Sequence, residues 1–543
     1  MATKLWERMS GAQLTFCVNF ITSFGIFFEG WNQGNMGFVN SSPEYQRLMG
    51  IGQNGVIDKP LREGGIVANY YLGATIGGLW GGHIADKYGR VKGVLLGCFF
   101  VLLGAPLMAS AKNAAWMCCA RVIAGLGVGF FITIIPVWSA EISSADKRGS
   151  VFSWVLVANF FGIFCAYWTG FGLSFIKDPE STIRWRLPFA LQAIVPLLMI
   201  PLISMLPDSP RWLLKQGRHK EALSVIAVFR GDGDPDHPDA RREYIEIIKS
   251  IEEDKKLADF DSYWRIVTDY KKDRLHFGRR AVLAFGIQML VEIGTGISLT
   301  TIYAPTVFKQ AGFSPYKADW LSGINGAMGI LGTICAVFLC DRYGRRTNLM
   351  VGNVFMGSLM WIFAGLSKGA IDHPESRGKY GAAACSMILL FTFVLCVFWM
   401  IVCFVYAAEI FPTMLRAKGN GFLAAGWGLG IGSGVLWFPP VVAKLGYQTF
   451  YIFGALNYVW IVVVYCFFPE TAGRSLESID LLFRSNSWFV WKNERDYARL
   501  QEEHQAGVTA SVERLEKTGK VYVHAGSGNS SEEVAHVETV EKL

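Results

Sequence analysis

The sequence predicts an all-α membrane protein with twelve transmembrane helices, arranged as two pseudo-symmetric six-helix bundles with a helical domain between them. Three observations predict this fold. Only 17% of the residues are charged and 52% are hydrophobic, whereas an average soluble chain carries about 25% charged residues. Twelve apolar runs are each long enough to cross a bilayer, which takes about 20 residues. A set of short motifs also occurs twice, once in each half of the chain.

The apolar runs form two sets of six. They lie near residues 14–36, 65–85, 91–111, 114–138, 150–173 and 185–206, and near 280–306, 318–340, 347–367, 383–408, 417–441 and 448–468. We therefore expect an N-terminal bundle over residues 1–206 and a C-terminal bundle over 280–470. The polar stretch 207–279 has helical spacing of Ile, Leu and Tyr among many charges, which predicts a cytoplasmic helical domain. The polar segment 471–543 is expected to be a cytoplasmic tail that is partly disordered.

The charge pattern and the cysteine pattern exclude several other classes of protein. The net charge of +7 comes from short basic clusters between apolar runs, so no nucleic-acid partner is expected. An even number of spans places both termini on the same side of the membrane. Basic clusters are typical of cytoplasmic loops, so we expect that side to be the cytoplasm. We expect a multi-pass protein of the plasma membrane that is monomeric. The eleven cysteines lack metal-site spacing, and no His cluster, nucleophile elbow or phosphate loop indicates an enzyme.

Three motifs recur in the same order in the two halves. They are DKYGR at 86–90 and DRYGR at 341–345, Glu141 with Arg148 and Glu409 with Arg416 at equal spacing, and PDSPR at 207–211 and PETAGR at 469–474. Chance would rarely produce three ordered pairs. The chain is therefore interpreted as a duplicated six-span unit.

With these motifs, the sequence resembles a sugar porter of the major facilitator superfamily from about residue 14 to 480. The segment GGHIADKYGR at 81–90 is similar to the superfamily signature between spans two and three. The PDSPR segment, and PET with the following SLE at 475–477, resemble the sugar-porter signatures, and the first and seventh spans look most like those of fungal porters. The resemblance implies a secondary transporter that moves a sugar or related polyhydroxy solute by alternating access. We expect no cofactor and expect a proton symporter driven by the proton gradient, with a facilitative uniporter as the alternative.

The resemblance also implies a charge network that closes a cytoplasmic gate. Its expected members are Asp86, Arg90, Glu141, Arg148, Asp341, Arg345, Glu409 and Arg416. The alternative is ordinary capping of helix ends and contact with lipid headgroups. Equal spacing in the two halves favours the gate.

Charged residues within spans are costly and usually functional. Three stand out, Glu29, Arg121 and Glu292. Aligned on the family motif, Asn32 takes the position of the aspartate found in proton-coupled members, and facilitative members also carry Asn there. Glu29 lies one helical turn from Asn32, so we hypothesise that Glu29 has taken over the proton-coupling role beside Arg121. Facilitated transport, or a structural pair of Glu29 with Arg121, is the alternative.

The resemblance places the substrate site in spans seven, ten and eleven, and we expect Asn325 of span eight to contribute to it. The residues it implies, with neighbours that can contribute, are Gln288, Glu292, Ser298, Tyr303, Asn325, Phe404 and Trp427. The family has amides where this chain has Glu292 and Ser298, and Gln288 can supply one missing amide. Glu292 favours a polyol-rich, amino or otherwise atypical sugar, or serves as a second protonation site.

A nutrient sensor with a carrier-like body is the alternative from another functional class. Such sensors resemble sugar porters but tend to have long signalling tails. The tail expected here is short, and the gate residues are present. The sequence therefore favours transport.

Overall fold

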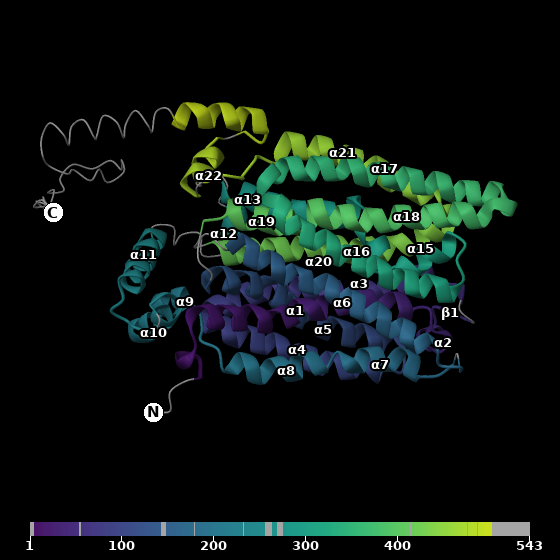
Figure 1. The fold of residues 1–543 in the computed structure, drawn as a ribbon, viewed down its shortest axis with the longest axis horizontal. Coiled ribbons are helices and arrows are strands. Elements are labelled where there is room, and N and C mark those ends of the chain that lie inside the picture. The colour runs from purple at the N-terminus through teal and green to yellow at the C-terminus, as the bar shows by residue number, and fades with distance from the viewer. Residues whose placement is uncertain are drawn as a thin grey trace, which may run out of the picture.

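The described part of the chain, in a computed structural model, is almost entirely helical (Figure 1). It comprises residues 5–501 except 54–55, 143–147, 179, 232, 256–262, 269–274, 413–414, 475 and 486. At residues 5, 148–153, 250, 253–255, 340–341, 417 and 476–477 the description covers the backbone only. This confirms the prediction of an all-α fold, apart from one two-stranded hairpin.

The N-terminal half begins with a capped helix and runs through α8. Its long helices are α1 (Gly11–Val39), α3 (Pro60–Tyr88), α4 (Arg90–Ala109), α5 (Ala114–Ile142), α6 (Arg148–Ser174), α7 (Ile183–Leu191) and α8 (Ile194–Ser204). A 3-10 turn, η1 (Leu5–Arg8), precedes α1, and Ser10 and Gln13 form a capping box at its start. The short helix α2 (Pro43–Met49) and the antiparallel hairpin β1 (Gly52–Gln53) and β2 (Val56–Ile57) connect α1 to α3.

The C-terminal half repeats this order with two local departures. Its elements are α13 (Phe277–Gly294), α14 (Ile297–Thr301), α15 (Ala304–Gln310), α16 (Pro315–Tyr343), α17 (Arg345–Asp372), η3 (Pro374–Ser376), α18 (Arg377–Leu395), η4 (Cys396–Met400), α19 (Ile401–Ile410), α20 (Arg416–Leu445) and α21 (Gln448–Phe467). The expected seventh span is interrupted at Gly296, whose φ of 86° only glycine adopts readily. The tenth contains a π turn, η4, of the kind that often lies at functional sites.

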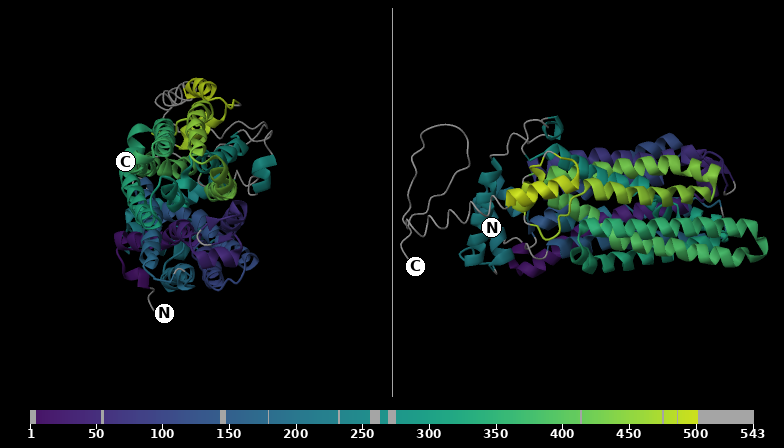
Figure 2. Two further views of the ribbon diagram at one scale, coloured as in Figure 1. Left: turned by 90° about the vertical axis from the view of Figure 1, so that its right-hand side faces the viewer. Right: turned by 90° about the horizontal axis from the view of Figure 1, so that it is seen from above.

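Short helices gather at one end of the two halves. They are α9 (Pro210–Lys215), α10 (His219–Arg230), α11 (Pro238–Lys255), α12 (Tyr263–Thr268) and α22 (Leu476–Phe483). We call this the linker end; α2 and the hairpin mark the opposite, hairpin end (Figure 1). Figure 2 shows the same arrangement from above, with the long helices parallel to one axis and the short ones beyond them.

Ten helical stretches in the described residues are long and apolar enough to cross a membrane. The remaining two of the twelve expected spans are α3 and the interrupted run α13–α15. Helix α3 is rich in glycine and carries charges near both ends. Helix α13 contains Arg279, Arg280 and Glu292 in only 18 residues. Both are polar because they face the interior of the protein, where side chains need not be apolar.

The two halves meet along two symmetry-related helix pairs, α3 with α20 and α6 with α16. Glycines allow the backbones to approach closely there. A Cβ atom added to Gly64 would lie 2.5 Å from the Val435 carbonyl oxygen, and one added to Gly326 would lie 2.9 Å from Phe164 Cα. Each half therefore reaches its partner through backbone surfaces that have no space for a side chain.

We expect the substitution Gly64→Ala to destabilise the protein by about 1–3 kcal/mol, because the new methyl group would overlap backbone atoms of α20. Gly65→Ala is the matched control, since a Cβ there meets only Leu436 Cδ1, at 3.9 Å. The control should be neutral or gain up to about 1 kcal/mol from helix propensity. Thermal unfolding of the purified variants in one detergent measures both effects. Equal unfolding temperatures for the two variants would contradict the close contact.

Candidate functional site

A cavity lies between the two halves, midway along the long helices. Its free volume is about 20 Å³, room for about one water molecule, so the walls of the cavity nearly meet in this conformation. The N-terminal half contributes Gln33, Asn159 and Phe160, and an adjoining hollow adds Glu29. The C-terminal half contributes α13, α14, α18, the π turn, α19 and α20 through Gln288, Val291, Glu292, Ile297, Thr301, Leu395, Trp399, Met400, Cys403, Phe404, Trp427 and Ile431. A solute in this cavity would contact both halves at once.

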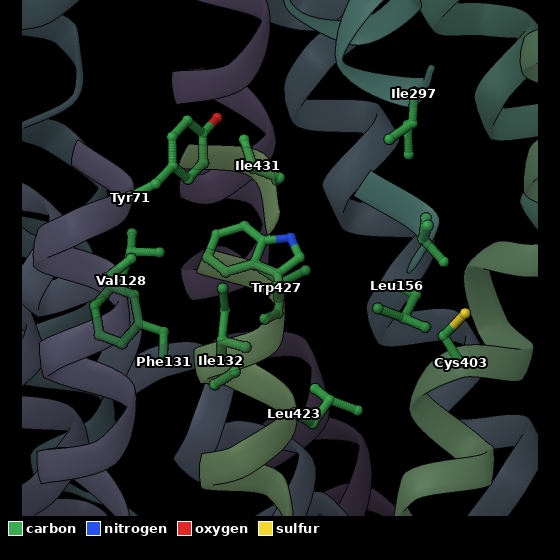
Figure 3. Packing of buried hydrophobic residues seen from close by; sticks show 14 of the residues in the cluster. Tyr71, Val128, Phe131, Ile132, Leu156, Ile297, Cys403, Leu423, Trp427 and Ile431 are labelled. Carbon is green, nitrogen blue, oxygen red and sulfur yellow. The ribbon is translucent and has the colours of Figure 1, made fainter. Parts of the chain in front are cut away.

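Four of the seven predicted substrate-binding residues line the cavity. Gln288 and Glu292 lie one turn apart on α13, and Phe404 and Trp427 come from α19 and α20. Figure 3 shows the Trp427 indole in the middle of the packed core, with its ring nitrogen directed away from Tyr71. The ring of Tyr71 meets the indole edge-on, with centroids 5.6 Å apart. This contact between α3 and α20 fixes the aromatic wall of the cavity.

The other three predicted residues lie around the interruption of the seventh span and outside the cavity lining. Tyr303 donates a hydrogen bond to the Val435 carbonyl (3.2 Å), and Asn325 donates to the Thr300 carbonyl (2.7 Å). Ser298 is buried, and its Oγ has no hydrogen-bond partner. In this conformation Tyr303 joins the α14–α15 link to α20, and Asn325 joins α14 to α16 by donating to a carbonyl at the end of the short helix.

Glu29 is buried at the cavity, with 2% of its surface exposed. Gln33 Nε2 donates to one carboxylate oxygen (3.0 Å), and the Tyr70 hydroxyl donates to the other (2.9 Å). Both oxygens therefore have a donor, which suits an ionised carboxylate that only accepts. Tyr70 joins this contact to α3.

Arg121 lies behind Tyr70 and is fully buried. Its guanidinium stands 5.1 Å from the centre of the Tyr70 ring and donates to Met36 Sδ (2.9 Å) and to the Val67 carbonyl (3.2 Å). The expected pairing of Glu29 with Arg121 is thus indirect, because Glu29 binds the hydroxyl of Tyr70 and Arg121 lies over its ring. Cation–π contact of this kind is stronger where water is excluded.

Asn32 points away from the cavity. Its amide lies 3.4 Å from Gln192 Oε1, in the link between α7 and α8. The face that Glu29 presents to the cavity is shared instead by Gln33, because four residues bring a helix closer to the same face than three.

Polar cavity residues that the sequence prediction omitted are Gln33, Asn159 and Thr301. Gln33 stands in the same span-one motif as Glu29, and Asn159 is a polar residue inside an apolar run. These two features are the signals by which the sequence could have identified Gln33 and Asn159 as cavity residues. Trp399, one turn from the predicted aromatic position, also lines the cavity and donates from its ring nitrogen to the Leu349 carbonyl (3.1 Å).

At the linker end of the N-terminal half, Arg90 binds Glu141 in a two-point contact. Arg90 Nε and Nη2 lie 2.9 and 2.8 Å from the two Glu141 oxygens. Nη1 also donates to the Ala85 carbonyl (3.0 Å) and to Asp86 Oδ1 (3.3 Å). The planar guanidinium matches a carboxylate, so this pair ties α4 to α5.

The C-terminal half repeats the contact. Arg345 Nε and Nη2 lie 3.2 and 2.6 Å from the two oxygens of Glu409, which joins α17 to α19. Thr471 Oγ1 donates to Glu409 as well (2.6 Å). Arg416 Nε donates to the Ala408 carbonyl (3.1 Å). The side chains of Arg148 and Asp341 lie outside the described residues.

One further carboxylate lies beside each of these two ion pairs and was not among the predicted gate residues. Asp208 accepts from the backbone N–H of Arg90 (2.8 Å) at the start of α4, and Glu470 accepts from those of Arg345 (2.8 Å) and Arg346 (3.0 Å) at the start of α17. Anions are stabilised at helix N-termini. Burial raises the pKa of the Asp208 carboxyl, against the N–H donors that lower it. The signal was the repeated Pro-acid dipeptide at 207 and 469.

Comparison with known proteins relates this chain to a family of transporters. The family described as "Sugar (and other) transporter" matches residues 18–483. MFS-type transporter criB of Aspergillus cristatus is 33% identical over 420 residues, covering 77% of this chain and 84% of that protein. Sugar transporter STL1 of Saccharomyces cerevisiae is 27% identical over 488 residues, covering 88% and 82%.

Among solved structures, the proton:xylose symporter XylE bound to 6-bromo-6-deoxy-D-glucose is similar with a TM-score of 0.72. The two chains are 22% identical, and the match covers 87% of this chain and 100% of the XylE chain. A partially occluded, inward-open structure of XylE from E. coli gives 0.69. The likeness shows that the fold is that of the major facilitator superfamily.

We expect Glu141→Gln to lower the free energy of unfolding by about 3 kcal/mol, because it breaks a nearly buried two-point ion pair and leaves Arg90 with only its longer contact to Asp86. The matched control is Glu246→Gln, which breaks the Arg242–Glu246 pair on an exposed face of α11. That change should cost less than about 1 kcal/mol. Thermal unfolding of the two purified variants compares them. A control as damaging as Glu141→Gln would mean that burial of the pair adds nothing.

Proposed function

Because this chain belongs to the sugar (and other) transporter family, we propose that it carries a sugar or related polyhydroxy solute across the membrane as a proton symporter. The solute binds in the central cavity, and access alternates as the two halves rock around it. The proton gradient supplies the driving force, and no cofactor takes part. The family is one of transporters, so no reaction on the solute is proposed.

The packing supports movement of each half as a unit. The Arg90–Glu141 and Arg345–Glu409 pairs connect helices within one half and leave the contact between halves unbridged by those pairs. Between the halves, α3 and α20 meet through glycine backbone and the Tyr71–Trp427 ring contact. Rocking requires that each half is stiff and that the contact between the halves can change. The ion pairs within each half and the glycine backbone contacts between the halves fit this requirement.

Proton coupling rests on one observation, the buried Glu29 carboxylate at the cavity. A proton on Glu29 would replace an acceptor by a donor, so Gln33 or Tyr70 would lose its present hydrogen bond. Since Tyr70 lies on α3 and also contacts Arg121, proton binding would change the contact between α1 and α3. The cavity and the proton site would thereby influence each other.

Facilitated transport without protons is the second candidate. Asn32, rather than an acid, occupies the position that the family resemblance assigns to the proton-coupling aspartate, and its amide contacts Gln192. In addition, both oxygens of Glu29 already have donors, as in a structural carboxylate. The two candidates differ in whether Glu29 binds and releases a proton during transport.

For the orientation, we propose that the linker end faces the cytoplasm, with both termini on that side of the plasma membrane. Basic residues flank the helices that begin there, among them Arg90 on α4 and Arg345 on α17, as expected for cytoplasmic loops. We propose that one chain is the functional unit, because the cavity is lined by the two halves of a single chain.

We expect proteoliposomes with an inward proton gradient to accumulate a solute against its concentration gradient. D-Glucose, D-xylose and glycerol form the test panel. Glu29→Gln should abolish this uphill accumulation and keep downhill exchange, because glutamine retains the hydrogen-bonding shape without a titratable proton. Radiolabel uptake with and without a protonophore measures both modes.

Glu375→Gln, a change of an exposed carboxylate in the α17–α18 connection, is the control and should behave as wild type. Equal uphill accumulation in wild type and Glu29→Gln would remove Glu29 from coupling. Exchange without any uphill phase in wild type would establish the facilitative candidate. Absence of all solute movement would favour a sensor.

A further inference from the structure

The wall of the cavity formed by α13 carries a carboxylate without a partner. Glu292 is buried, with 5% of its surface exposed, and its Oε2 has no hydrogen-bond partner. One turn earlier, Gln288 Nε2 is equally unsatisfied. Both residues line the same space. A buried polar group that lacks a partner costs free energy, and a buried charge costs more, so this wall is suited to a ligand that supplies what is missing.

The nearby cation does not serve Glu292. The described contacts of Arg121 are with Met36, Val67 and Tyr70, and Arg121 is not one of the residues that line the cavity. Glu29 differs from Glu292 because both of its oxygens accept from Gln33 and Tyr70. Among the described residues, none forms an ion pair with Glu292, so a bound cation could supply its counter-charge.

The rest of the lining favours a cation that also carries hydroxyl groups. Aromatic rings of Phe160, Trp399, Phe404 and Trp427 border the cavity, and the face of an aromatic ring attracts an ammonium group. Amides of Gln33, Asn159 and Gln288 supply groups that can donate to and accept from hydroxyls. A proton on Glu292 would satisfy the charge but would make no use of the aromatic rings or of the amides that border the cavity.

We propose that the transported solute is a polyhydroxy compound with a protonated amine, such as an amino sugar or amino polyol, whose ammonium group binds Glu292 while its hydroxyls contact Gln288. This inference rests on the proposed transport function and specifies its substrate class. The ammonium group donates to Glu292 Oε2 in a charge-assisted hydrogen bond.

Binding to the purified full-length protein tests this inference with three probes. D-Glucosamine carries the ammonium group, N-acetyl-D-glucosamine has the same ring with a neutral amide, and D-glucose has a hydroxyl at that position. Quenching of the fluorescence of the cavity tryptophans reports binding, at a pH where the amine is protonated. Wild type should bind glucosamine roughly 10- to 100-fold more tightly than either neutral probe, as a charge-assisted hydrogen bond predicts.

Glu292→Gln should abolish that preference, and Glu292→Asp, which keeps the charge, should retain part of it. Glu375→Gln should leave all three affinities unchanged. Thermal unfolding of each variant checks that it is folded, and the Asp variant provides a reading if the Gln variant is not.

Equal affinity for the three probes in wild type, or an unchanged preference in Glu292→Gln, would overturn the inference. So would a Glu292→Gln variant that loses only proton-driven accumulation of a neutral sugar, since Glu292 would then be a second protonation site. In the first two results wild type still binds a solute, and in the third it still accumulates one, so none of them overturns the proposed transport function. If no probe binds and none is transported under a proton gradient, both proposals fail.

Discussion

A polar side chain inside a bundle that faces lipid must find its partner within the protein, because hydrocarbon offers none. At the linker end, Arg90 and Arg345 meet this requirement with Glu141 and Glu409. In the membrane interior, Arg121 meets it with a tyrosine ring, a thioether and a carbonyl oxygen. In the cavity, Gln288 and Glu292 each have an atom without a hydrogen-bond partner, and a bound solute can supply that partner.

The two halves bury their polar groups in the same way at the linker end. They do so differently at the cavity. Gly89 and Gly344, both with positive φ, let Asp208 and Glu470 approach the starts of α4 and α17. At the cavity the symmetry ends, because the N-terminal half holds a carboxylate with two donors and the C-terminal half holds one with an unsatisfied oxygen. Duplication has kept the mechanical parts alike and allowed the chemistry of the two walls to diverge.

The interrupted seventh span links these two kinds of feature. Gly296 breaks the helix, and the carbonyls around the break are held by Asn325 and by Tyr167. Tyr167 belongs to α6 in the other half, and its hydroxyl donates to the Thr301 carbonyl (2.6 Å). A movement of α14 that opens the cavity would have to exchange this bond between halves.

Several features could be predicted from the sequence because they depend on composition and local spacing. Long apolar runs and a repeated motif set were sufficient for the helical architecture and its duplication, and a charge inside a span was sufficient to single out Glu29, Arg121 and Glu292. The motifs at residues 86–90 and 341–345 marked the arginines that form the ion pairs. All of these are properties of a segment by itself.

Other features were decided by the tertiary structure. Glu29 and Arg121 are joined through Tyr70, which a separate helix supplies, and Asn32 contacts Gln192 although it lies within one turn of Glu29. Tyr303 and Asn325 hold a helix break, whereas Gln33 and Asn159 border the cavity. The sequence by itself determined which segments form the long apolar helices and which charges are unusual within them. Which groups meet across the cavity was decided only by packing, because a side chain's partners come from helices far away in the chain and a rotation of about half a turn exchanges the cavity for the neighbouring helix.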